Sequence, residues 1–271
     1  RAEGARSFVL HTLNRMARGG IHDQLGGGFH RYSVDEAWRV PHFEKMLYDN
    51  ALLPLLYLQA YQLTGDEEYA GVAVRTLEYV RREMSHPEGG FYSAQDADSE
   101  GEEGRFFVWR PEELAAVLGE EDGALLAFHL GVTERGNFEG GRTVLQAARS
   151  EAETAEAFGI GVEEARRRIR EGKRRLFAAR ERRVRPALDD KVIAGWNALM
   201  ISAFAQAAAC LRNEAYLARA VQAADFIERR LVVGARLRRS FREKTSTIGG
   251  YLEDYAYWVA ALLDLYEATL E

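Results

Sequence analysis

The sequence predicts an all-α fold in which helical hairpins repeat and close into a toroid. Residues 50–84 align without gaps to residues 197–231, with ten of the 35 positions identical. A single hairpin cannot bury its apolar face, so repeated hairpins must stack on one another. The inner segments are apolar nearly all round, which is typical of helices covered on both sides. Because the copies are widely spaced, with polar-aromatic loops before the inner helices, a closed ring is favoured over an open superhelix.

Helical patterns account for most of the chain. We expect helices at residues 5–18, 43–63, 67–84, 111–118, 122–130, 161–181, 190–210 and 213–231, with a final helix from about residue 250. Two aromatic runs around an acidic, glycine-containing loop predict a small β-hairpin near residues 90–109. A weaker third copy of the repeat places Asp254 opposite Asp49 and Tyr266 opposite Tyr61. We expect one domain over residues 1–271.

The composition excludes several classes of protein. A formal charge of −6 gives no general attraction to nucleic acid or to an anionic membrane. Cys210 is the only cysteine, so neither an internal disulfide nor a cysteine-based zinc site is expected. We expect a cytoplasmic protein without metal or cofactor. We also expect no transmembrane helix, because we find no apolar stretch of about 18 residues without a charge. The chain lacks an initiator Met and stops within a helical pattern, so we expect a portion of a longer protein.

Residues 26–50, GGGFHRYSVDEAWRVPHFEKMLYDN, form an unusually polar and aromatic approach to an apolar helix. One interpretation is a capped helix start, with Pro41 just before the first turn and Glu44 within it. A cap needs one or two polar groups, whereas this stretch carries His30, Arg31, His42, Glu44, Asp49 and Asn50. Asp49 and Asn50 lie inside the apolar helix, where an unpaired polar group costs about 1–3 kcal/mol, so these two require partners. A hydrogen-bond network between hairpins and a ligand-facing site are equal alternatives.

The internal repeat separates structural from functional candidates. Asn50 is retained as Asn197 in the second copy, which indicates a structural role such as tying an inner helix to its neighbour. Position 49 instead changes to Trp196. Two further positions at the same end of the helix also change, His42 to Asp189 and Glu44 to Lys191. Divergence at one end of equivalent helices is expected where a pocket is built.

Two charged segments allow functional readings that we do not favour. The loop DADSEGEEG matches the first positions of an EF-hand, but its twelfth position is Phe107 rather than glutamate, which excludes that site. Asp96 and Asp98 are expected at a solvated hairpin tip or over the mouth of the toroid. The basic segment 163–186 has a buried apolar stripe, so we interpret it as a solvated outer helix rather than a nucleic-acid site.

Four long segments of this sequence, at residues 17–53, 89–109, 189–205 and 249–269, resemble one family. It is the family of large thioredoxin-domain proteins typified by the spermatogenesis-associated member. The resemblance implies a six-hairpin (α/α)₆ toroid similar to N-acylglucosamine 2-epimerases and toroidal glycosidases, preceded by a thioredoxin-like domain. This chain would be an incomplete toroid, lacking that domain and the last hairpins. Redox chemistry does not carry over, because Cys210 is the only cysteine.

A polar bowl lined by aromatic side chains suits a saccharide. A glycosidase requires two carboxylates, whereas an epimerase or isomerase requires an acid and a base that titrate near neutral pH. We assign candidate catalytic roles to His30, His42, Glu44, Asp49, Asp190 and Asp254. We assign candidate ligand contacts to Arg31, Tyr32, Trp38, Asp96, Asp98, Trp109, Lys191 and Trp196. The alternative is a non-catalytic recognition module that serves the thioredoxin-like domain, and exposed toroid edges predict self-association.

Overall fold

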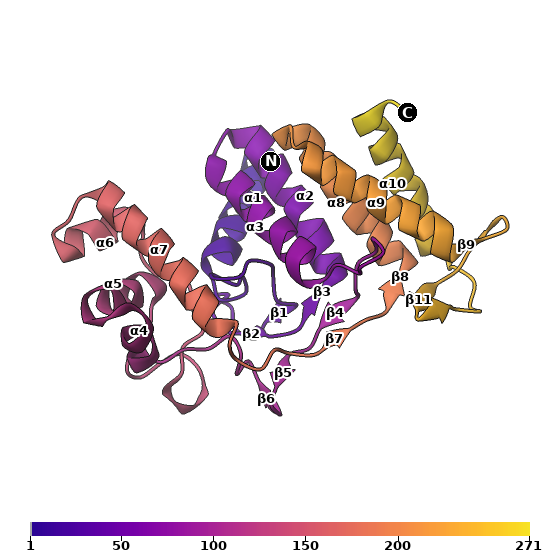
Figure 1. Cartoon of the computed structure of the whole chain (residues 1–271). Coiled ribbons are helices and arrows are strands. Elements are labelled where there is room, and N and C mark those ends of the chain that lie inside the picture. The colour runs from indigo at the N-terminus through magenta and orange to yellow at the C-terminus, as the bar shows by residue number, and fades with distance from the viewer. Residues whose placement is uncertain (1) are drawn as a thin grey trace. The chain divides into compact units, whose positions relative to one another are not determined.

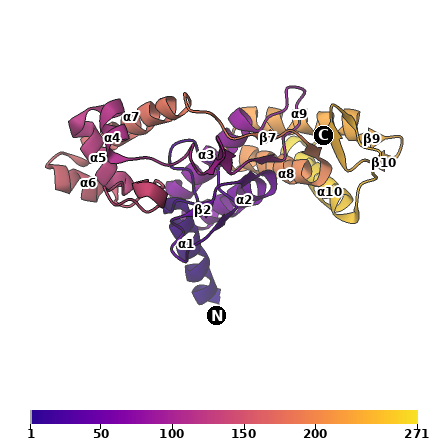
Figure 2. The same cartoon turned by 90° about the horizontal axis from the view of Figure 1, so that it is seen from below.

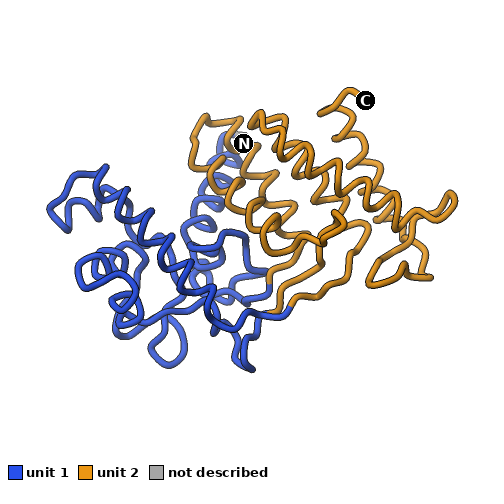
Figure 3. The backbone as a smooth tube through the Cα atoms, viewed as in Figure 1, with its two compact units in different colours: residues 1–44, 97–187 blue, residues 45–96, 188–271 orange. Residues whose placement is uncertain are grey.

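The structure, a computed structural model, describes residues 2–271 and consists mainly of helices joined by short strands (Figure 1). It divides into two compact units (Figure 3). Unit 1 comprises Arg1–Glu44 and Ala97–Ala187, and unit 2 comprises Lys45–Asp96 and Leu188–Glu271. Each unit is therefore built from two separate stretches of the chain. This division does not test the expectation of one domain over residues 1–271, which stays a prediction.

Unit 2 contains both clear copies of the repeat. Its helices are α2 (Leu47–Thr64), α3 (Glu67–Glu83), α8 (Ala194–Leu211), α9 (Glu214–Leu231) and α10 (Leu252–Thr269). Helices α2 and α8 begin and end at equivalent positions of the two copies, so the repeat predicted from the sequence is confirmed as two helical hairpins. Helix α8 packs between α2 and α10 and also against its own outer helix α9 (Figure 1).

Short strands connect the helices of unit 2. They are β3 (Lys45–Met46), β4 (Ala94–Gln95), β7 (Leu188–Asp189), β8 (Val192–Ile193), β9 (Val232–Val233), β10 (Arg236–Leu237), β11 (Ser240–Arg242) and β12 (Lys244–Thr245). Two three-stranded antiparallel sheets form, in the orders β3-β4-β7 and β12-β11-β8, and β9 pairs with β10. A strand thus precedes each inner helix of the repeat, β3 before α2 and β8 before α8.

The predicted starts of the inner helices, at residues 43 and 190, were too early. Residues 41–46 alternate between fully buried and partly exposed positions, with Phe43 and Lys45 both 0% exposed. This period of two is that of a strand and not of a helix. The helices begin only at Leu47 and Ala194, directly after these strands.

Asn50 and Asn197 have the structural role expected from the repeat. Both are fully buried, and each donates its side-chain amide to the carbonyl four residues earlier, at 2.9 Å to Met46 and 3.0 Å to Ile193. Asn197 also donates to the carbonyl of Phe91 at 3.0 Å and accepts from its N–H at 2.7 Å. The second inner helix is thereby fixed to the strand-forming loop after α3.

Helix α8 contradicts one expectation. Its 18 residues carry no charged side chain, so by length and composition it could cross a membrane. However, 67% of it is buried inside the protein. The core helix of a soluble protein passes the same test, so one such helix is weak evidence for a membrane span.

Unit 1 holds the remaining elements. They are α1 (Ala2–Arg18), β1 (Tyr32–Ser33), β2 (Pro41–His42), β5 (Asp98–Ser99), β6 (Glu102–Glu103), α4 (Pro111–Leu118), α5 (Glu120–Leu130), the 3₁₀ turn η1 (Glu139–Gly141), α6 (Glu151–Phe158) and α7 (Val162–Arg180). Helices α4 and α5 pack on each other and on α7 (Figure 2). The short helix α6 was not predicted, although Ser150 and Glu153 form a capping box at its start.

The basic segment is the solvated outer helix that the sequence predicted. Helix α7 buries Ala165, Ile169 and Leu176 on one face. Its exposed arginines pair with nearby acids, as Arg167 does with Glu164 at 2.6 Å.

Candidate functional site

The candidate site of unit 1 is built on β2 and the residues that follow it. Because this segment is extended, side chains two residues apart point to the same side. Phe43 is fully buried, and His42 and Glu44 project together on the opposite side, with His42 Nε2 3.2 Å from Glu44 Oε2. The helix expected from residue 43 would instead have put Glu44 in a helical turn, where residues two apart do not face each other.

His42 lies between two carboxylates. Its Nδ1 is 2.7 Å from Glu103 Oε1, while its Nε2 faces Glu44. Carboxylate oxygens only accept hydrogen bonds, so whichever ring nitrogen carries a proton donates it to the carboxylate that it faces. Glu103 Oε1 also accepts the backbone N–H of Phe43 at 3.2 Å, which fixes the carboxylate next to the ring.

A tight hairpin positions Glu103. Strands β5 and β6 pair antiparallel, with Asp98 opposite Glu103, and their turn residues Glu100 and Gly101 both have positive φ. Two positive φ angles are the mark of the tight turns that match the twist of paired strands. Gly104 then leaves the hairpin at φ 73°, where an added Cβ would lie 2.4 Å from the Phe43 ring. A small β-hairpin is therefore present within residues 90–109, as predicted, but its strands lie in the acidic loop, and the two aromatic runs around that loop do not pair with each other. The hairpin delivers a carboxylate to His42.

Strand β1 supplies the second wall of the site. It pairs antiparallel with β2, placing Tyr32 opposite His42, and the two rings stack with centroids 5.0 Å apart. The neighbouring Arg31 donates to Glu44 Oε2 at 2.9 Å. Arg31, Glu44, His42 and Glu103 thus form one continuous chain of polar contacts on the surface of unit 1.

The loop between β1 and β2 is held by its own backbone. The Asp35 carboxylate accepts hydrogen bonds from the N–H groups of Ala37, Arg39 and Val40, the closest at 2.7 Å. Gly19 and Gly20 lie against the same loop, and a Cβ on Gly20 would come within 1.9 Å of the Arg39 carbonyl oxygen. The two glycines therefore allow an approach that no other residue permits.

A cavity of about 470 Å³ opens beside His42. It is lined by Tyr32, Val34, Val40, Pro41, His42, Gly101, Glu102, Glu103, Phe138, Glu139 and Arg142. Its volume is in the range of sites for small molecules, and it combines aromatic faces with a few polar groups, as such sites do. Arg142 donates to Glu102 at 2.9 Å, and this hydrogen bond, with the nearby Arg105, holds the pKa of the Glu102 carboxyl below its usual range.

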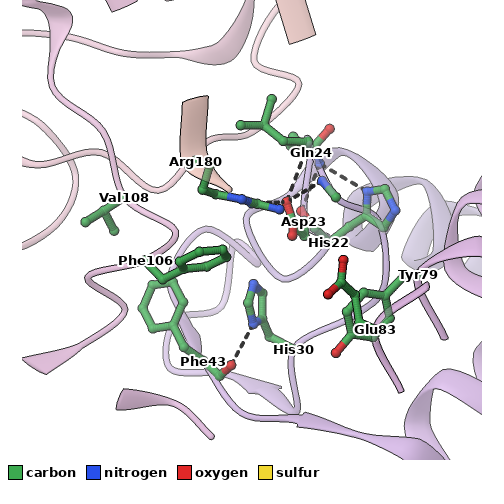
Figure 4. A network of polar contacts seen from close by, with 12 residues as sticks. His22, Asp23, Gln24, His30, Phe43, Tyr79, Glu83, Phe106, Val108 and Arg180 are labelled. Atoms are coloured by element: carbon green, nitrogen blue, oxygen red, sulfur yellow. Dashed lines mark hydrogen bonds and ion pairs between the residues drawn. The ribbon is translucent and has the colours of Figure 1, made fainter. Parts of the chain in front are cut away.

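Three other predicted candidates of unit 1 lie outside this cavity. His30 is 2% exposed, with Nδ1 2.9 Å from the Phe43 carbonyl (Figure 4). Trp109 is 1% exposed and packs in the core formed by α4, α5 and α7. Trp38 is partly exposed at the turn between β1 and β2, at φ 61°. His30 and Trp109 therefore have the surroundings of core residues.

A buried ion pair lies in the same region as His30. Arg180 donates to Asp23 at 2.8 Å, and each side chain is 4% exposed (Figure 4). Asp23 also accepts the N–H groups of Leu25 and Gly26. A Cβ on Gly26 would lie 2.3 Å from Arg180, so this glycine makes room for the guanidinium. The pair ties the glycine-rich loop to α7.

In unit 2, the positions equivalent to His42 and Glu44 also pair. Lys191 Nζ is 2.9 Å from Asp189 Oδ2, so the two-residue spacing is kept while the charges are reversed. The neighbouring Asp190 pairs with Arg242 at 2.6 Å. Asp254 is fully buried, accepts the Gly195 N–H at 2.9 Å and caps α10 through the Tyr251 N–H. These contacts give Asp254 a structural position.

The remaining candidates are spread over both units. Asp49 lies in the first turn of α2, and Trp196 contacts the Tyr48 ring edge-on at 4.9 Å. Asp96 is exposed in unit 2, and Asp98 is exposed at the start of β5 in unit 1. Within residues 2–271, no group of three or more His, Cys, Asp or Glu side chains is arranged to hold a metal ion.

Several residues of the cavity were not predicted from the sequence. Glu102 and Glu103 belong to the acidic loop already singled out, but Asp96 and Asp98 were chosen from it instead. The β5–β6 pairing, which follows from the turn at Glu100–Gly101, would have pointed to Glu103. Phe138 and Arg142 flank η1 in an irregular segment, where periodicity gives no signal.

Comparison with known proteins shows which family this chain resembles. No protein-family model matches the sequence. Over 301 aligned positions it is 42% identical to spermatogenesis-associated protein 20 from Mus musculus, covering 98% of this chain and 38% of that protein. The chain is thus homologous, over nearly all of its length, to a part of that protein that is well under half of it. The family resemblance seen in the sequence is confirmed.

Solved structures establish the fold. The unsaturated glucuronyl hydrolase of Bacillus sp. GL1, responsible for the degradation of glycosaminoglycan, matches with a TM-score of 0.53 at 16% identity, over 98% of this chain and 50% of that one. A structure of UGL with dGlcA-Glc-Rha-Glc matches with a TM-score of 0.52 at 15% identity, over the same shares. The expected α/α toroid fold with small β-hairpins is therefore confirmed.

Proposed function

We propose that this chain, a homologue of part of spermatogenesis-associated protein 20, binds a saccharide in the His42 cavity and performs acid–base chemistry on it. The observation that carries the proposal is the His42 imidazole, held between Glu44 and Glu103 at the wall of a cavity of about 470 Å³. The fold it shares with a glucuronyl hydrolase makes a carbohydrate the first ligand class to test.

The geometry suits proton transfer by His42. A histidine whose ring is oriented by a carboxylate is a common general acid or base, and such a group contributes about 10²–10⁴-fold to a rate. Glu103 orients the ring through Nδ1, and Nε2 shares Glu44 with Arg31. A ligand that displaces Glu44 from Nε2 would receive or donate the proton there. This favours an epimerase- or isomerase-type reaction over a glycosidase, because both carboxylates are engaged with the imidazole.

Two aromatic side chains give the cavity a surface for a sugar ring. Tyr32 is 50% exposed and stacks on His42. Phe138 also lines the cavity, and the Arg142 guanidinium lies over its ring. The C–H face of a pyranose packs on such rings, and the carboxylates accept hydrogen bonds from its hydroxyls.

A second candidate is recognition without turnover. The contacts from Arg31 through Glu44 and His42 to Glu103 satisfy one another without any ligand, as in a purely structural network. In that case the cavity would bind a glycan for the larger protein, with the expected thioredoxin-like domain as its partner.

The test begins with a thermal-shift screen of saccharides against the 271-residue chain, since a ligand that binds the folded state raises its apparent stability. Each hit is then incubated with the wild type and with H42Q, E103Q and E44Q, and the sugar is followed by NMR. We expect H42Q to abolish conversion of the hit and to leave its binding within about threefold. Binding without conversion by the wild type would favour the recognition module, and no shift with any saccharide would contradict both candidates.

A further inference from the structure

The charges that line the His42 cavity are unevenly balanced. Three carboxylates line it, from Glu102, Glu103 and Glu139, against two basic groups, those of His42 and Arg142. Both basic groups are already paired. Arg142 donates to Glu102 at 2.9 Å and to the Glu139 carbonyl at 3.2 Å, and His42 faces Glu103 at 2.7 Å.

The ion pairs of this cluster leave more carboxylates than basic groups. The other partner of His42, Glu44, is shared with Arg31, so no cation of this cluster is left over. Glu139 is exposed, and within residues 2–271 its carboxylate makes no ion pair. Arg142 contacts Glu139 only through the backbone carbonyl of that residue. Among the residues that line the cavity, a ligand therefore meets a carboxylate without a cationic partner, that of Glu139, whereas both basic groups are paired; Arg110, which donates to the Gly140 carbonyl at 2.6 Å, lies on the same turn but outside the lining.

We infer that the cavity selects a saccharide bearing an amine over one bearing a carboxylate. This rests on the proposed saccharide binding at His42 and specifies its substrate class. An ammonium group can donate to the Glu139 carboxylate while Tyr32 and Phe138 hold the ring. A uronate would place a second negative charge in the same cavity and would have to displace Glu102 from Arg142. At separations of about 4–6 Å near a surface, one such charge changes affinity by about tenfold, and salt screens the effect.

The experiment compares three sugars that share one ring and differ in charge: glucosamine, glucose and glucuronate. Their affinities for the 271-residue chain are measured by NMR titration at low and high ionic strength. We expect glucosamine to bind tightest and glucuronate weakest, with about tenfold between them at low salt and a smaller ratio at high salt. If monosaccharides bind too weakly to rank, the corresponding short oligosaccharides replace them.

Two substitutions locate the effect. E139Q should lower the affinity for glucosamine about three- to tenfold and leave that for glucose unchanged. E102Q releases Arg142 and should raise the affinity for glucuronate. The matched control is E156Q, which removes the same charge from the exposed part of α6. It should change neither.

The outcomes separate this inference from the proposed function. Glucuronate binding as tightly as glucosamine, or an order unaffected by E139Q, would overturn the charge selection and leave saccharide binding intact. If none of the three sugars or their oligosaccharides binds, saccharide binding at His42 fails, and the selection fails with it.

Discussion

His42 Nδ1 lies 2.7 Å from Glu103 Oε1, although 61 residues separate them. In the second copy of the repeat, Asp189 and Lys191 keep the spacing of His42 and Glu44 and form an ion pair with the charges reversed. The pairing of these two positions is therefore a property of the repeat. Only the first copy has an imidazole at this position and a second carboxylate, which the β5–β6 hairpin brings. The candidate site is therefore assigned to the first copy.

G104A should destabilise unit 1 by about 2–4 kcal/mol. The new Cβ would lie 2.4 Å from the buried Phe43 ring, and φ is 73°, so a steric clash in the core adds to backbone strain. Urea unfolding followed by circular dichroism measures the loss. G101A is the matched control, because Gly101 has φ 79° but nothing within 4 Å of the added Cβ. Equal losses for the two variants would show that the Phe43 contact contributes nothing.

N197A should lower the free energy of unfolding by about 3 kcal/mol. The side chain is fully buried, and its loss strands the N–H and carbonyl of Phe91 without their partner. Chemical denaturation of the variant checks this value. N213A removes only an N-cap of α9 and should cost about 1 kcal/mol. A cost for N197A no larger than that for N213A would contradict the tie between α8 and the Phe91 loop.

The repeat made the helices of unit 2 predictable, because periodic apolar residues report burial directly. The two-residue strands were not predictable in this way, since they are shorter than any window in which alternation is counted. One signal was overlooked: GGF occurs at residues 27–29 and again at 89–91, and each copy leads three residues later into a strand, β1 or β4. Glu103 was missed because its position depends on hairpin pairing, and Arg142 because it follows an irregular segment.

R212G should stabilise the protein by about 1 kcal/mol. Arg212 ends α8 in the left-handed region at φ 53°, and its equivalent at the end of α2 is Gly65 at φ 72°. Glycine adopts this conformation without steric cost, and helices commonly end with it. Thermal and urea unfolding measure the gain. R212A is the control, since it removes the same side chain without relieving φ, and a gain as large in R212A would rule out the backbone explanation.

Stability should depend on pH through His129. Burial lowers the pKa of its imidazole to about 3, so the folded state keeps the ring neutral while the unfolded state protonates it below pH 6.5. Stability is therefore lost as the pH falls from about 6.5 towards 3, at up to about 1.4 kcal/mol per pH unit. H129L should reduce the loss between pH 7 and pH 5 by about 2 kcal/mol, measured by urea unfolding at both values. H11Q, which removes an exposed histidine of α1, should leave the loss unchanged.

An apolar stripe on α10 should cause the chain to self-associate. Leu252, Val259, Leu263 and Tyr266 are each at least 55% exposed, and their spacing places them on one side of the helix. Leu270, 78% exposed, follows the last residue of α10. A contiguous apolar surface of this kind is typical of an interaction site. Sedimentation velocity should show a species whose size grows with concentration.

L263E should weaken the association more than tenfold, because a carboxylate buried at the contact without a partner costs more than about 1.4 kcal/mol. V184E adds the same charge at an exposed valine of unit 1 and should have no effect. A wild-type chain that sediments as a monomer at high concentration would show that the stripe of α10 does not bind a second copy. Association that survives L263E would move the contact to another surface.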